Sequence, residues 1–305
     1  MKRVLVVHFS QTGQLAQVVR QLVAPLAGAP DVQLVDEVLR PRRPYPFPWP
    51  FWGFLDAMPE SVLLEPPELK PLAVHPDEPF DLIVLAYQVW FLAPAGPATA
   101  FLKSAAGRRL LNGRPVVTVI ACRNMWLTAQ ETVKRLIREA GGLLRDNVVF
   151  TDRAGVLASF ITTPRWLLTG KRDSLLGLPP AGVPAGDIAS AGRFGGALLG
   201  ALRADRQREA APMLGGLGAA PVDARLILSE RAGQRAFSVW ARLIRLAGPA
   251  GAWTRLPLLA LFGAYLIAMI LVVVPPSLLV QRLLRPLLAR RLESARAYYE
   301  LPSGR

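Results

Sequence analysis

The feature that most constrains the fold is an alternation of short apolar runs with amphipathic segments over residues 1–152. The apolar runs lie at 4–7, 32–35, 81–87, 115–121 and 147–150, and helical patterns lie at 15–26, 97–104 and 128–140. The runs are brief and mostly rich in β-branched residues, as buried strands are. Strands that are apolar throughout and separated by amphipathic helices predict a parallel sheet covered on both faces, and therefore an α/β fold.

The loop between the first strand and the first helix predicts an anion site. The chain turns from strand to helix within about five residues, so the unpaired N–H groups of the helix face the loop. That loop reads Ser10, Gln11, Thr12, Gly13 and Gln14. Two hydroxyls add donors, and the glycine lets the backbone approach a ligand closely. The alternative is that the hydroxyls merely cap the helix.

Two further loops follow strands and should meet the first one. In an open parallel sheet, ligands lie at the carboxyl ends of the strands. We expect residues 88–94 and 122–126 to converge there on the loop 10–14. They offer two indoles, a cation and an amide, in Trp90, Trp126, Arg123 and Asn124, with Gln88, Val89, Phe91 and Cys122 as further candidate contacts. A planar cofactor with a phosphate tail, flavin mononucleotide (FMN), fits this set; the alternatives are core packing for the indoles and a solvated loop position for the arginine.

Residues 41–79 interrupt the alternation. The segment places six aromatic side chains among prolines, which excludes a helix in its first half: Tyr45, Phe47, Trp49, Phe51, Trp52 and Phe54. It is either a covering loop whose rings pack on the domain or an aromatic lid over an apolar ligand.

The C-terminal half has a different composition. Residues 153–230 contain many Gly, Pro and Ala residues and predict a loosely packed connector with one helix near 188–202. Residues 231–305 predict a basic, apolar helical region, whose run 258–274 is free of charge and proline, at the lower limit for a bilayer span. Arginines flank the run equally, which gives no orientation and favours a helix that bends at Pro275 and Pro276 and returns. A full span, or a soluble hairpin buried in a homodimer, stays open.

Charge and cysteine content narrow the function classes. The formal net charge is +14, divided as +3 over residues 1–150 and +11 over the remainder. The arginines flank leucine runs without any nucleic-acid module, so we expect anionic membrane lipid as a partner and no nucleic acid. A single cysteine and two histidines exclude an internal disulfide and predict no metal site. The short apolar start predicts no secretory signal, and hence an active domain in the cytosol at the cytoplasmic face of the inner membrane.

The loop 10–14 resembles that of the flavodoxin-like family, which places Ser/Thr-x-Thr-Gly-x-Ser/Thr/Asn on the flavin phosphate; Gln14 departs from this pattern. The resemblance covers residues 1–152 and implies a five-stranded sheet of order 2-1-3-4-5. A closer resemblance is to the dialkylresorcinol condensing enzymes of that family. It rests on the stretches HFSQTGQL, PYPFPWPFWGFLDAMPESVL, YQVWFLAPAGPATAFLKS and VIACRNMWLTAQE.

That resemblance implies an FMN-dependent oxidoreductase that works beside a ketosynthase and aromatises a lipophilic dialkylcyclohexanedione to a resorcinol. Arg123 would stabilise negative charge on the reduced flavin. Tyr87 or His8 would be the base; a satisfied, neutral histidine is the alternative for the second. Two other functions stay open: a quinone reductase or electron carrier at the membrane, and a cofactor-free scaffold that is a partner of a ketosynthase.

Overall fold

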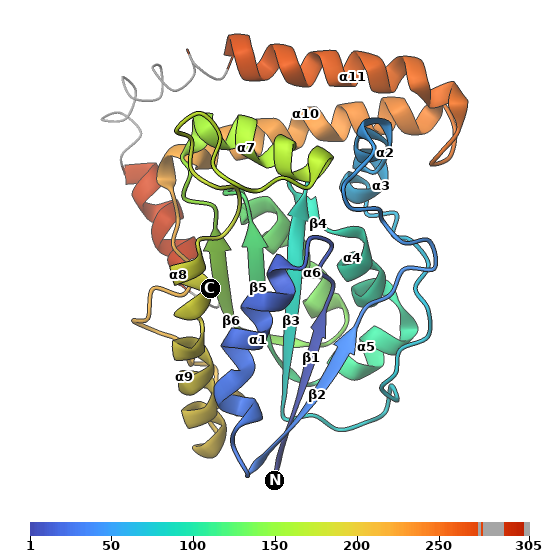
Figure 1. The fold of residues 1–305 in the computed structure, drawn as a ribbon. Helices are drawn as coiled ribbons and strands as arrows, with labels where there is room; N and C mark the ends of the chain where they lie inside the picture. Colours follow the sequence, from blue (N-terminus) through green and yellow to red (C-terminus); the bar gives the residue numbers. More distant parts are fainter. Residues whose placement is uncertain (274–275, 277–289, 302–305) are drawn as a thin grey trace.

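The computed structural model describes residues 1–273, 276 and 290–301. Its centre is a parallel sheet of order β2-β1-β3-β5-β6 (Figure 1). The strands are β1 (Lys2–His8), β2 (Val32–Val38), β3 (Leu82–Trp90), β5 (Pro115–Cys122) and β6 (Leu143–Thr151), with a two-residue β4 (Ala93–Pro94) antiparallel to the end of β3. The expected five parallel strands and their order are confirmed.

Two hydrophobic cores lie on the two faces of this sheet. Side chains alternate along each strand, so Val4 and Val6 enter one core while Leu5 and Val7 enter the other. On the first face lie α1 (Gln14–Ala27) and α9 (Gly192–Arg203), and on the second lie α4 (Gly96–Lys103), α5 (Ala105–Leu111) and α6 (Leu127–Glu139). The expected helices on both faces are therefore confirmed.

Helix α9 belongs to the part of the chain that we expected to be a loosely packed connector, and for this helix that expectation is wrong. Phe194 and Leu198 are buried in the first core beside α1. A Cβ at Gly195 would lie 1.8 Å from the carbonyl oxygen of Leu22, so the two helices touch backbone to backbone. The small residues that suggested loose packing instead permit this close approach.

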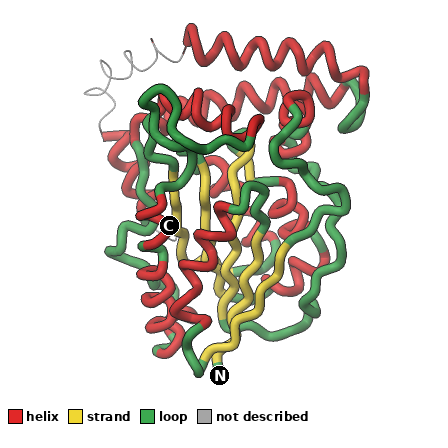
Figure 2. The backbone as a smooth tube through the Cα atoms, in the orientation of Figure 1, coloured by secondary structure: helices red, strands yellow, loops and turns green. Residues whose placement is uncertain are grey.

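The remaining elements of residues 153–230 are α7 (Val156–Thr169), α8 (Ala185–Ala189) and two 3-10 turns, η1 (Arg206–Arg208) and η2 (Ala224–Leu226). The strands run away from the N-terminus, so their carboxyl ends meet the loops and helices drawn at the top of Figure 2, where α7 lies. This end of the sheet is the one at which a ligand was expected.

The segment 41–79 contains two short helices, α2 (Phe51–Asp56) and α3 (Met58–Val62). The expectation of no helix in its first half is wrong from Phe51 onward. Pro50 occupies the N-cap of α2, where the absence of an N–H costs nothing, and so the proline-rich run precedes the helix and does not break it.

Four elements lie across the same end of the sheet: α10 (Ile227–Leu246), η3 (Trp253–Arg255), α11 (Leu256–Ala268) and a π-helical turn (Met269–Val273). By length and composition, Trp253–Val272 is the one described helix that could cross a membrane. Pro275, half of the expected bend, lies outside the described residues. A last helical segment, 290–300, packs near α6, where Lys134 Nζ donates to Tyr298 Oη.

Candidate functional site

The loop Ser10–Gln14 leaves the start of α1 without a side-chain cap. Gly13 occupies the N-cap with φ +79°, and the first helical bond runs from Gln17 N to Gly13 O at 3.1 Å. The backbone nitrogen of Gln14 lies 3.4 Å from Thr12 Oγ1, which is long for a hydrogen bond, so this contact is weak. The Ser10 hydroxyl is buried and bonds to no described residue. These donors match the needs of an anion.

The side chain of Gln14 is not one of those donors. Its Nε2 donates to Val183 O at 3.1 Å, and its Oε1 accepts from Val183 N at 2.9 Å. A Cβ at the neighbouring Gly182 would lie 2.6 Å from this Oε1, so the two segments fit closely together. The residue that departs from the flavodoxin-like loop pattern therefore fastens residues 181–183 beside the loop.

Helix α7 covers the carboxyl ends of β5 and β6. Arg123, which directly follows β5, donates from Nε to Ser159 Oγ at 2.8 Å, and its guanidinium lies 3.8 Å from the ring centre of Phe160. Burial lowers the pKa of Arg123 to about 10, which leaves it protonated at neutral pH. Arg123 thus supplies a buried positive charge at the sheet edge beneath α7.

Two hydroxyls of α7, those of Thr162 and Thr163, are buried and lack a partner among the described residues. They lie between the contact of α7 with Arg123 and the contact of Trp166 with Gly182. An unpaired buried hydroxyl costs about 1–3 kcal/mol. Ser10, at the end of β1, carries the other buried hydroxyl of this region without a described partner.

Trp90 lies in a strand and not in a loop, which corrects the expectation for residues 88–90. Strand β3 continues to Trp90 and pairs there with β4. Its indole meets the rings of Tyr45, Trp49 and Phe9 edge to face at 4.9, 5.6 and 5.9 Å. The segment 41–79 therefore packs on the end of β3, and the Trp90 indole is part of this cluster of four aromatic rings.

The first and third strand ends do meet as expected. The N–H of Gln11 donates to Gln88 Oε1 at 3.3 Å, and Gln11 Nε2 donates to Pro46 O at 2.9 Å. Phe91 adopts φ +50° and packs on Phe54 with ring centres 4.9 Å apart. Direct contacts thus join the loop 10–14 to the end of β3 and to the segment 41–79.

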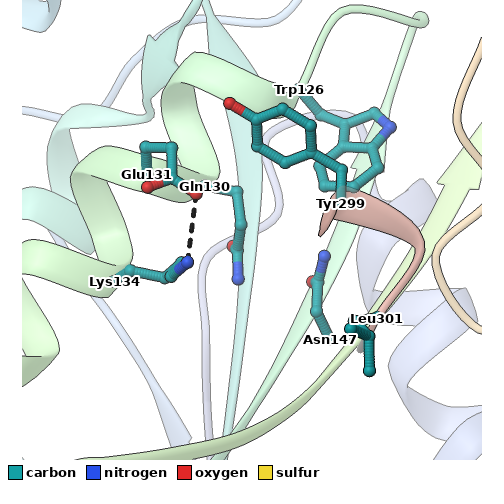
Figure 3. A pocket seen from close by; sticks show the side chains of 7 residues that line it. All are labelled: Trp126, Gln130, Glu131, Lys134, Asn147, Tyr299 and Leu301. Carbon is teal, nitrogen blue, oxygen red and sulfur yellow. Dashed lines mark hydrogen bonds and ion pairs between the residues drawn. The ribbon is translucent and has the colours of Figure 1, made fainter. Parts of the chain in front are cut away.

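Tyr87 and Trp126 lie in the second core, which for Trp126 is the alternative of core packing. Tyr87 is fully buried and donates to Gln130 Oε1 at 2.6 Å, and burial raises its pKa well above the usual value. Trp126 is 2% exposed and packs edge-on against Tyr299. Figure 3 shows the rings of Trp126 and Tyr299 at a pocket of about 10 Å³, near the volume that one water needs. Neither side chain reaches a ligand at the strand ends in this conformation.

His8 is the remaining candidate base. Its Nε2 lies 3.1 Å from Asp36 Oδ1, while Nδ1 is buried without a partner among the described residues. Burial lowers the pKa of His8 more than Asp36 raises it, so the imidazole is neutral at pH 7. A proton on Nε2, donated to Asp36, leaves Nδ1 free to accept one.

The other predicted contacts are less specific. Val89 is partly buried against the second core, and Asn124 is half-buried in the loop after β5. The Cys122 thiol also packs on the second core, and burial raises its pKa, so it is not a thiolate. Within the described residues, no three His, Cys, Asp or Glu side chains gather as a metal site would need.

Sequence reasoning missed Asp152, which directly follows β6. Its Oδ1 accepts from Ala154 N at 2.7 Å and its Oδ2 from Gly182 N at 2.8 Å, so one carboxylate fixes both segments that flank α7. The principle that ligands lie at the carboxyl ends of parallel strands applies to Asp152 as well and would have identified it. The hydroxyls of Ser159, Thr162 and Thr163 carried no such signal, because α7 follows no recognisable motif.

Comparison with models of protein families and with curated proteins gives no match. Among solved structures, a flavoprotein from Lactobacillus acidophilus NCFM in complex with FMN is 15% identical, covers 49% of this chain and 93% of its own, and has a TM-score of 0.39. Two candidate flavoproteins, from Bacteroides eggerthii and Bacteroides uniformis, are 17% and 16% identical over 49% of this chain and 88% and 90% of their own, both with a TM-score of 0.37. The strand order of the chain itself is the flavodoxin-like one.

Proposed function

We propose that this protein is an FMN-dependent oxidoreductase that acts at a membrane on a lipophilic cyclic substrate. The observation that carries the proposal is the uncapped start of α1 beside the buried, unpartnered Ser10 hydroxyl. It lies after β1, where β2 and β3 flank that strand and the connections leave in opposite directions. Flavodoxin-like folds bind FMN at this switch point.

The residues present fit such a group. The hydroxyls of Ser10 and Thr12 and the N–H groups that begin α1 would hold the phosphate, with the positive end of the helix dipole directed at it. Gln88 fixes the loop through the N–H of Gln11. Arg123 brings a positive charge to the same edge, suited to a ring system that becomes anionic.

The finer assignment is the oxidation of a dialkylcyclohexanedione to a resorcinol, with a ketosynthase as the source of the dione. The substrate loses a hydride and a proton, and FMN, when bound, would supply the acceptor for the hydride. His8 would receive the proton at Nδ1, since its imidazole is neutral at pH 7 and Nε2 faces Asp36, whose carboxylate would stabilise the cation. The rings of Phe54 and Phe91 offer apolar contact for alkyl chains, worth about 0.8 kcal/mol for each buried methylene.

Gly182 and Val183 lie against Gln14 of the loop, and Trp166 of α7 lies against Gly182. Entry of the cofactor would therefore require α7 and residues 182–183 to move together. Gly155 and Gly170 bound the helix with φ +80° and +75°, conformations that other residues rarely adopt. We propose that these ends act as hinges and that Thr162 and Thr163 face the cofactor once α7 closes again.

A second candidate, the cofactor-free scaffold, is favoured by one observation. The paired bonds between Gln14 and Val183 hold the loop through contacts within the chain. A quinone reductase or an electron carrier would also bind FMN. These two functions differ from the main proposal in the molecule that exchanges electrons with the flavin.

The test is a visible absorption spectrum of the full chain purified in mild detergent, before and after FMN is added. Gly13→Asp places a negative charge where the phosphate would bind. Gly113→Asp is the matched control, because Gly113 also has a positive φ and open space around it but lies before β5, at the opposite end of the sheet. The proposal is supported if flavin bands are present in the wild type and in the Gly113→Asp control and absent in Gly13→Asp. If none of the three proteins shows flavin bands, the cofactor-free scaffold is the function that remains.

A further inference from the structure

Helix α11 has an outward face that is almost wholly apolar. Over Trp253–Val272 the exposed positions recur every three or four residues, and only 22% of an 18-residue window within this stretch is buried. Apart from Thr254 they are apolar: Trp253, Leu256, Pro257, Ala260, Leu261, Ala264, Ile267, Ala268, Leu271 and Val272. A surface helix of a water-soluble domain directs charged and polar residues outward. This helix does the opposite, so a large apolar patch is exposed.

The orientation of α11 is fixed by its inner face. Leu259 and Phe262 are buried in a third hydrophobic cluster with residues of α2, α3 and α10. Arg255, fully buried, donates to Asp56 Oδ1 at 2.9 Å and to Glu60 Oε1 at 2.6 Å. Turning the apolar face inward would break this buried ion cluster, so the exposure is built into the packing.

Helix α10, whose Trp240 packs on Phe262 of α11, also carries exposed basic side chains. Arg235 and Arg242 are exposed, and no described residue pairs with them, whereas Arg245 pairs with Glu65 at 2.7 Å. Exposed apolar residues lie among them on the same helix, at Val239, Leu243 and Leu246. Cations interspersed with apolar side chains are typical of a helix that lies on an anionic lipid surface.

The path of the chain argues against a single crossing. Both α10 and the segment 290–300 contact the α/β part, the first through Glu230 to Thr128 and the second through Tyr298 to Lys134. A single crossing would place the segment 290–300 on the other side of the bilayer from α10, so these two contacts exclude it.

We propose that the outward face of α11, together with Arg235 and Arg242, lies in one leaflet of an anionic bilayer with the helix parallel to its surface. This deepens the membrane association in the proposed function, on which it rests, and turns the strand-end edge of the sheet toward the lipid. A second copy of the chain is the other occupant, and the test below distinguishes it from lipid.

The test is flotation of the full-length protein with vesicles of phosphatidylcholine alone and of phosphatidylcholine mixed with phosphatidylglycerol. We expect binding to the anionic vesicles and its loss in the double variant Leu261→Glu, Ile267→Glu. Leu143→Glu is the matched control, an exposed leucine at the start of β6, the opposite end of the sheet. Arg235→Gln with Arg242→Gln should weaken binding about 30-fold, at roughly fivefold for each basic residue near the surface.

Three outcomes would overturn the proposal. The first is that the wild type and the double variant Leu261→Glu, Ile267→Glu bind anionic vesicles equally. A dimer in sedimentation that this variant abolishes, without vesicle binding, is the second and identifies another copy as the occupant. Labelling of Val272→Cys by an impermeant maleimide trapped inside the vesicles is the third, since it requires a crossing. Measuring bound FMN in each variant separates a failure of docking from a failure of the cofactor proposal.

Discussion

Glu230 makes the stability of this protein depend on pH in a predictable way. The side chain is 1% exposed and accepts from Thr128 N at 2.6 Å and from Thr128 Oγ1 at 2.9 Å, at the start of α6. Burial raises the pKa of Glu230 from its ordinary 4.5 to about 7, although these hydrogen bonds favour the charged form. The carboxyl group therefore prefers to keep its proton in the folded protein.

The sign and size of the effect follow from the two pKa values. Below pH 4.5 both states hold the proton, between 4.5 and about 7 only the folded state does, and above 7 neither does. The stabilising contribution is thus complete at low pH and is lost as pH rises through this window. At 1.36 kcal/mol for each pKa unit it amounts to about 3 kcal/mol.

The perturbation is Glu230→Gln, which keeps the acceptor oxygen for Thr128 and removes the titration. Between pH 5 and pH 8 we expect the free energy of unfolding of this variant to rise relative to wild type by about 2–3 kcal/mol. Urea unfolding at several pH values measures it, with the exposed Glu209→Gln as control. Parallel pH profiles for Glu230→Gln and wild type would refute the reasoning.

Three further predictions concern single contacts. Gly195→Ala should lower the free energy of unfolding by about 3 kcal/mol in urea, because its Cβ would meet a backbone carbonyl of α1. Gly196→Ala, in open space, should slightly stabilise α9, and equal effects of the two substitutions would contradict the packing of α9 on α1. Arg255→Met should destabilise the α10–α11 hairpin by about 3–5 kcal/mol and speed its hydrogen exchange, since two carboxylates lose their buried partner. Tyr87→Phe should leave flavin binding and turnover unchanged and cost about 1 kcal/mol of stability; lost turnover would restore Tyr87 as a catalytic residue.

Local pattern sufficed for the sheet and for the loop 10–14. The five apolar runs became parallel strands because such runs have few alternatives to burial on both faces. The loop was located because a strand that turns directly into a helix defines a position in the fold without knowledge of any partner. Alternation along β3 could also have placed Tyr87, which shares its core with Ile83 and Leu85.

Tertiary structure decided everything that depends on contacts distant in sequence. The backbone contact of Gly195 with α1, the cover that α7 forms over Arg123, and the bonds of Gln14 to Val183 each join segments that no local periodicity relates. The same holds for α11, whose composition shows an apolar helix but not which side is exposed. Composition and period set what each segment can become, while the face that it buries is chosen by the shape and charge of neighbours that folding alone brings together.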